Sequence, residues 1–85
     1  MTERACQPGC QSHSVEITNR TDSPIMVYIE PWGDEIDLQP REQMRVDIIG
    51  PGQKPVAVSY LVGSIVVEGW QGTTAEAWKG SERVN

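Results

Sequence analysis

Short runs in which apolar and polar residues alternate occupy most of the sequence and constrain the fold more than any other feature. In residues 14–19, Val15 and Ile17 alternate with Glu16 and Thr18. This period of two is typical of a half-buried β-strand, whose successive side chains point to opposite faces. Further runs of this kind are predicted over residues 25–30, 34–38, 43–49, 56–62, 65–68 and 73–79. Proline, glycine and small polar residues separate the runs, and such regular turns predict an antiparallel β-sandwich of six to seven strands, or alternatively a small β-barrel.

The length of 85 residues allows one domain with one thin core. Residues 1–13 have no apolar period and are predicted to be a disordered N-terminal tail. Residues 14–80 should form the β-sandwich domain, and residues 81–85 should be a frayed C-terminus. The last strand is the weakest, since residues 75–77 would also suit a helical turn. The predicted core residues are Val15, Ile17, Val27, Ile29, Ile36, Val46, Ile48, Val58, Tyr60 and Val67.

The formal net charge of −5 makes the protein acidic and bears on the class of partner. A protein that binds nucleic acid normally presents a basic surface to the phosphates, and anionic lipid also attracts basic residues. We therefore expect neither nucleic acid nor a membrane as partner. No apolar run approaches the roughly 20 residues of a membrane span, and the N-terminus lacks an apolar secretory segment. The expected location is cytoplasmic.

An aromatic residue stands at the corner formed by residues 30–34, where Pro31 and Gly33 flank Trp32. Tryptophan and tyrosine rings dominate the energetics of many interfaces. Trp32, Trp70 and Tyr28 are therefore the candidate binding residues, with Trp32 as the candidate anchor. The alternative is that each tryptophan closes one end of a thin core that contains no phenylalanine.

Two cysteines and the sole histidine lie in the predicted tail, in the pattern Cys6-x3-Cys10-x2-His13. Thiolate and imidazole are zinc ligands, which makes these three residues an alternative metal site. The spacing differs from the usual C-x2-C pair, and a second pair is missing. Two free thiols in a disordered tail are therefore the preferred interpretation, with a local disulfide as another alternative. No cofactor is expected.

Four carboxylates occur within eight residues: Glu30, Asp34, Glu35 and Asp37. A loop with this composition could bind Ca²⁺, but the spacing is not that of an EF-hand. The alternation places Glu35 and Asp37 on the solvent side of a strand, where charge also discourages edge-to-edge pairing. We interpret the cluster as a solvated face.

Several turns in the chain resemble those of a group of small bacterial single-domain β-sandwich proteins. The likeness is carried by residues 19–24 (Asn-Arg-Thr-Asp-Ser-Pro), 30–33 (Glu-Pro-Trp-Gly), 38–40 (Leu-Gln-Pro) and 69–72 (Gly-Trp-Gln-Gly). It covers most of residues 14–80 and implies a fold without an activity. A much looser likeness links the Asn-Arg turn, the glycine corner and the Leu-x-Pro turn to the β domain of the von Hippel–Lindau tumour suppressor. The hydroxyproline pocket of that domain has no counterpart here.

The sequence contains no catalytic signature, so we do not expect an enzyme. The predicted function is a non-enzymatic binding or protein-interaction module anchored by Trp32, with an unidentified protein partner. A metal-binding role through Cys6, Cys10 and His13 is one alternative. A small structural or assembly protein is another, since exposed edge strands can pair two copies. A monomer or weak dimer is expected.

Overall fold

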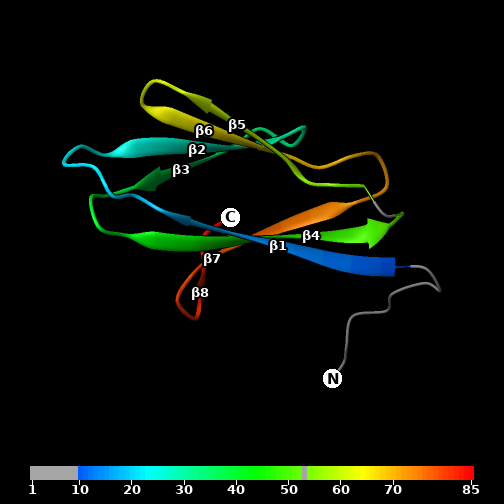
Figure 1. Ribbon diagram of the computed structural model, residues 1–85. Helices are drawn as coiled ribbons and strands as arrows, with labels where there is room; N and C mark the ends of the chain where they lie inside the picture. The colour runs from blue at the N-terminus through cyan, green and yellow to red at the C-terminus, as the bar shows by residue number, and fades with distance from the viewer. Residues whose placement is uncertain (1–9, 53) are drawn as a thin grey trace.

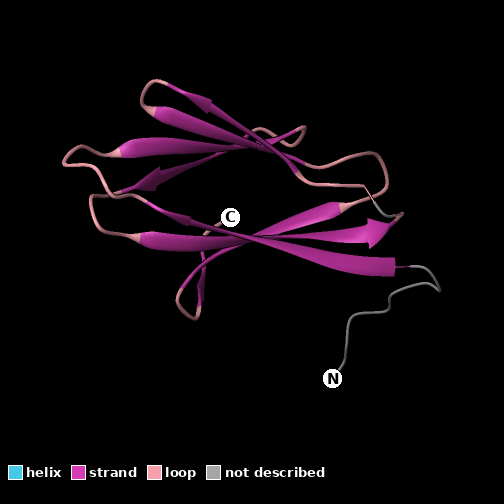
Figure 2. Cartoon of the chain, viewed as in Figure 1, coloured by secondary structure: helices cyan, strands magenta, loops and turns pink. Residues whose placement is uncertain are grey.

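The computed structural model describes residues 10–52 and 54–85, which form a sandwich of two four-stranded sheets (Figure 1). Figure 2 shows that strands joined by short loops make up the described chain. The strands are β1 (Cys10–Thr18), β2 (Ile25–Glu30), β3 (Asp34–Leu38), β4 (Gln43–Pro51), β5 (Ala57–Leu61), β6 (Ser64–Glu68), β7 (Thr74–Lys79) and β8 (Glu82–Arg83). Sheet A has the order β1-β4-β7-β8 and sheet B the order β3-β2-β6-β5. Both sheets are open, which confirms the predicted sandwich and not the barrel alternative.

The core lies between the two sheets and is built from the alternating positions of the strands. In β4, Met44, Val46 and Ile48 are buried, whereas Gln43 and Arg45 on the other face are exposed. Burial of each such aliphatic side chain is worth about 1.5–3 kcal/mol. The buried cluster consists of Ile17, Val27, Ile29, Ile36, Leu38, Met44, Val46, Ile48, Val67, Ala75 and Ala77. Most of the predicted core is thereby confirmed, and Val15 packs against its margin.

The prediction that Val58 and Tyr60 belong to the core is wrong. They lie on the core-facing side of β5, opposite Val67 and Ile65 of β6, but are 50% and 71% exposed. β5 is an edge strand of sheet B, and all of its residues are exposed, those on the core-facing side as well as those on the outer side. A period of two shows which residues share a face but not whether the facing sheet reaches far enough to cover that face.

One strand pairing departs from the expected antiparallel arrangement, because β2 and β6 are parallel neighbours in sheet B. The remaining ladders are antiparallel, including the predicted hairpin between β5 and β6. Its two turn residues are Val62 and Gly63, one position earlier than predicted, and the φ of +81° at the second of them is not that of a II′ turn. The parallel pairing brings together the outward side chains of two segments far apart in sequence.

The boundaries predicted for the domain also need correction. β1 begins at Cys10, so residues 10–13 pair with the end of β4 instead of belonging to a tail. Residues 1–9 lie outside the described part of the chain. At the other end, β8 extends sheet A into the segment that was expected to fray, and Val84 packs against the core. The described residues include no helix long and apolar enough to cross a membrane.

Asn19 is a buried polar residue between the two sheets, with only 1% of its surface exposed. Its Nδ2 donates to the carbonyl oxygens of Ser23 and Leu38, both at 2.9 Å. Its Oδ1 accepts from the Thr21 backbone N–H at 2.9 Å and from the Thr21 hydroxyl at 2.7 Å. Every polar atom of the side chain is therefore satisfied, as a buried amide requires. The side chain fixes the loop after β1 and ties it to the end of β3.

The backbone of Asn19 completes this junction on the side of sheet A. Its N–H donates to the Glu42 carbonyl at 2.9 Å, and its carbonyl accepts from the Arg41 N–H at 2.8 Å. Arg41 has a φ of +70°. This conformation is unusual for a side chain other than glycine. The guanidinium of Arg41 donates to the Thr21 carbonyl and to Asp22, which joins the two loops a second time.

Replacement of Asn19 should therefore destabilise the whole domain. Asn19→Ala removes four side-chain hydrogen bonds, among them the buried bond to the Leu38 carbonyl. We expect the free energy of unfolding in urea to fall by about 3 kcal/mol. Arg20→Ala, at the exposed neighbouring position, is the control and should change it by less than about 0.5 kcal/mol. Equal stability of the two variants would contradict this role for Asn19.

Glu42 holds the turn between β3 and β4. Its Oε1 accepts from the Gln39 N–H at 2.9 Å and from Lys79 Nζ at 3.0 Å. The hydrogen bond from the Gln39 backbone, followed by the bond and charge of Lys79, lowers the pKa of Glu42 below its usual value of 4.5. The ionised carboxylate thus links the turn before β4 to β7 through Lys79.

This lowered pKa predicts a pH dependence of folding stability. Because the folded pKa is below the unfolded one, the stabilisation is complete above pH 4.5 and is lost as the pH falls through the folded pKa. Glu42→Gln should be less stable than the unaltered protein at neutral pH, and the difference should shrink on acidification. Urea unfolding on both sides of pH 4.5 measures it, and a constant difference at all pH values would contradict the assignment.

Candidate functional site

The corner between β2 and β3 presents Trp32 at one end of sheet B. The Glu30–Pro31 peptide bond is cis, Gly33 has a φ of +81°, and the Gly33 N–H donates to the Ile29 carbonyl at 2.9 Å. The indole ring lies against Gly69, where an added Cβ would come within 2.6 Å of the ring atom Cη2. The residue is 39% exposed. One part of the ring therefore packs on the backbone that follows β6, and the rest faces solvent.

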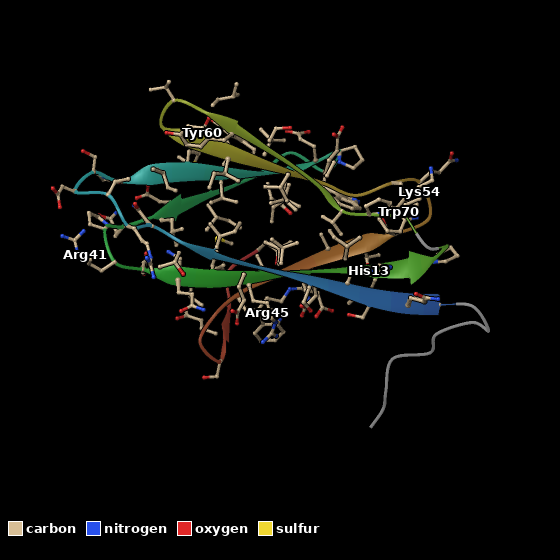
Figure 3. All side chains as sticks on the ribbon, viewed as in Figure 1. His13, Arg41, Arg45, Lys54, Tyr60 and Trp70 are labelled. Carbon is tan, nitrogen blue, oxygen red and sulfur yellow. The ribbon has the colours of Figure 1, made fainter. Side chains whose placement is uncertain are left out.

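Trp70 lies at the same end of the sandwich but is turned toward the core. Its Nε1 donates to the Pro51 carbonyl at 2.9 Å, and its ring centroid is 5.8 Å from that of His13 (Figure 3). It packs against the hydrophobic cluster and is only partly exposed. This geometry agrees with the alternative in which a tryptophan closes the end of a thin core.

Tyr28 lies on the outer face of sheet B, which the other sheet does not cover (Figure 1). Register places Glu35 of β3 on one side of Tyr28 and Val66 of β6 on the other. We name this surface the acidic face. Its outward side chains are Glu35 and Asp37 of β3, Met26, Tyr28 and Glu30 of β2, Ser64, Val66 and Glu68 of β6, and Ala57, Ser59 and Leu61 of β5.

The acidic face carries charge of one sign only. Four of its side chains are carboxylates, and none is a lysine or arginine. These carboxylates are four of the twelve acidic residues of the protein. Within the described residues none of the four is in a salt bridge, and Asp37 accepts a hydrogen bond from the neutral amide of Gln39 at 2.6 Å. Apolar side chains, with Tyr28 and Val66 at their centre, lie between the carboxylates.

The outer face of sheet A is different, because it carries arginines beside its acidic side chains. Arg45 bonds Asp47 at 3.0 Å, and Arg83 lies 3.9 Å from Glu76. The guanidinium of Arg45 also lies 5.8 Å from the ring centroid of Trp78, within the range of a cation–π contact. A depression of about 320 Å³ is lined by Glu16, Gln43, Met44, Arg45, Trp78 and Gly80. Charge of a single sign is thus a property of the acidic face and not of the outer face of sheet A, where Arg45 and Arg83 lie beside carboxylates.

The Cys/Cys/His pattern does not converge in the described part of the chain. Cys10 is disulfide-bonded, so the preferred interpretation of two free thiols is wrong, and a disulfide sulfur is not the thiolate that binds zinc. His13 lies three residues along β1 and points to the opposite face, toward Trp70. Cys6 lies outside the described residues. Residues 10–52 and 54–85 contain no group of three histidine, cysteine or acidic side chains that could hold a metal ion.

Sequence reasoning identified Glu35 and Asp37 as outward residues but missed Val66 and Glu68 of β6 as part of the same surface. The parallel β2–β6 pairing brings the two groups together across sheet B. Hydrophobic alternation gives the two faces of each strand but not the order of strands in a sheet, so no signal in the sequence indicated this surface.

Comparison with known proteins gives no match for the chain. No family model, curated protein or solved structure is significantly similar to it. The function must therefore be inferred from the surfaces described above.

The contact between Trp32 and Gly69 can be tested by adding one carbon atom. Gly69→Ala should displace the ring of Trp32 and lower the free energy of unfolding by about 1–2 kcal/mol. In a Trp32→Ala background the same substitution should cost less, because only the Thr73 hydroxyl, 3.0 Å from the added Cβ, remains close. A double-mutant cycle in urea measures the coupling. The same cost in both backgrounds would show that the ring does not rest on Gly69.

Proposed function

We propose that this protein is a non-enzymatic interaction module that binds a basic protein segment on its acidic face. The observation that carries the proposal is the combination of four carboxylates, no basic residue and a half-exposed apolar centre on one uncovered sheet face. Tyr28 is the central anchor, and Trp32 lies beyond the end of the face, against Gly69, the residue that follows Glu68.

The charge arrangement favours a partner that carries lysine or arginine residues. Like charges on neighbouring strands repel each other, and here no cation of the same face relieves that repulsion. The carboxylates lie on three adjacent strands, and neighbouring ones are one strand spacing or two residues apart, about 5–8 Å, so their fields add. A basic segment is steered toward such a surface and screens it on binding. Nucleic acid and anionic lipid would be repelled by it.

The apolar centre supplies the contact energy that charge alone does not. Exposed ion pairs contribute about 0–1 kcal/mol each, whereas a central aromatic residue that becomes desolvated is often worth 2 kcal/mol or more. Tyr28 and Val66 lie side by side, and Leu61, 57% exposed, lies toward the β5 edge. The partner should therefore alternate or interleave basic and apolar side chains. The interpretation of the acidic residues as a merely solvated face did not take into account the apolar side chains that lie among them.

A synthetic peptide of alternating lysine and leucine provides the binding probe, and isothermal titration measures its affinity. Glu35→Gln combined with Glu68→Gln should weaken binding about tenfold, as two contacts of about 0.7 kcal/mol would. Glu16→Gln combined with Glu82→Gln removes the same net charge from sheet A and is the matched control. Its affinity should stay within about twofold of the unaltered protein.

Tyr28→Thr keeps a strand-forming residue and removes the aromatic anchor. We expect it to weaken binding of the same peptide about thirtyfold, or about 2 kcal/mol. Trp32→Ala should weaken it less than Tyr28→Thr does, because only part of the ring faces solvent and its contact with Gly69 lies on the side of Thr73. Equal losses in the two glutamine pairs, together with unchanged affinity of Tyr28→Thr, would show that only net charge attracts the peptide and would overturn the proposal.

A further inference from the structure

The edge of sheet B formed by β5 lacks the features that usually protect an exposed strand. Residues 56–62, Val-Ala-Val-Ser-Tyr-Leu-Val, contain no charged residue, no proline and no glycine. Among the described residues β5 pairs with β6 alone, so its outer edge presents a row of backbone hydrogen-bonding groups. Its side chains are apolar on both faces, with Val58 and Tyr60 on one and Ala57 and Leu61 on the other.

The other three sheet edges in the described chain are protected. β3, the opposite edge of sheet B, carries Asp34, Glu35 and Asp37 within five residues. β8 has two residues, both charged. The outward side chains of β1 are polar, and Ser14 among them bonds Asp47 on β4 at 2.7 Å. Charge and shortness are the usual devices against edge pairing, and β5 alone has neither.

We propose that β5 pairs with β5 of a second copy of this chain, antiparallel and with Ser59 on the two-fold axis. In a symmetric pair residue i contacts residue j while j contacts i. With Ser59 at the centre, Val58 lies opposite Tyr60 of the second copy, and Ala57 lies opposite Leu61 of the second copy. Cross-strand pairs of an aromatic and a β-branched side chain are favourable in antiparallel sheets. The segment is thus self-complementary about its central residue.

The placement of charge fits a second copy of this acidic chain in particular. The carboxylates of β3 are three strands away from β5, about 14 Å, beyond the screening length of about 8 Å at physiological ionic strength. Glu68, the acid nearest to β5, is paired with Ala57 at one end of the strand, so the two copies place it at opposite ends. Two copies can therefore join without like charges meeting, and sheet B becomes an eight-stranded sheet with its two acidic faces side by side.

Charged substitutions of Ser59, the residue on the two-fold axis, test this assembly. The full chain should show an average mass in sedimentation equilibrium that rises from 9.4 kDa toward twice that value as concentration increases. Ser59→Glu and Ser59→Lys each place like charges opposite one another and should remain monomeric at the same concentrations. An equimolar mixture of the two variants should dimerise at least as tightly as the unaltered protein, because opposite charges then meet. This recovery also shows that both variants are folded.

The matched control is Ser12→Glu, at an exposed serine on the edge strand β1 of the other sheet, which should dimerise like the unaltered protein. A mass that stays at 9.4 kDa at every concentration would overturn the proposal. The free edge of β5 would then have to pair with a strand of a different protein. Dimerisation that persists in Ser59→Glu would overturn it as well, since another surface would then be responsible. Binding of the basic peptide to the acidic face is measured separately, so either proposal can fail without the other.

Discussion

The hydrogen bonds of Asn19 are the constraint on which the arrangement of the two sheets depends. One buried amide holds the loop that leaves β1, the carbonyl at the end of β3 and, through its backbone, the turn that enters β4. The β1–β2 loop and the β3–β4 turn each connect sheet A with sheet B. A thin core of aliphatic side chains is non-directional and would tolerate sliding of one sheet over the other. The amide adds a fixed geometry, because moving the sheets would leave its buried donors and acceptor unsatisfied.

With the sheets fixed in this way, the molecule has two outer faces of unlike character. On sheet A the arginines lie beside carboxylates and beside Trp78, so charges of both signs lie together on the face. On sheet B four carboxylates surround Tyr28 and Val66 without a cation. The uncharged β5 strand forms one edge of that sheet and the acidic β3 strand forms the other. The features that distinguish one surface from the rest therefore gather on sheet B, and both the proposed partner and the proposed second copy are placed there.

The extent to which the sequence predicted the structure differs from one strand to the next. In β4 the alternation of Met44, Val46 and Ile48 with polar residues gave the correct buried face, because both neighbours of β4 lie in the same sheet and the other sheet covers it. In β5 the same kind of alternation placed Val58 and Tyr60 in the core, and they are exposed. The Trp32 corner was recognised from Pro31 and Gly33, but the orientation of the ring depends on its contact with Gly69, which is 37 positions away in the sequence.

The sequence by itself determined most of the strands, the approximate turns between them, the two faces of each strand and the net charge, since these follow from local residue order and composition. Only the tertiary structure decided which strands are neighbours and which faces are covered. The parallel pairing of β2 with β6 joins Tyr28 to Val66 and completes the acidic face, and the edge position of β5 leaves its apolar side chains in solvent. The physical reason is that strand order is set by packing of the whole core, a sum over contacts distant in sequence, whereas alternation reports only the local direction of each side chain.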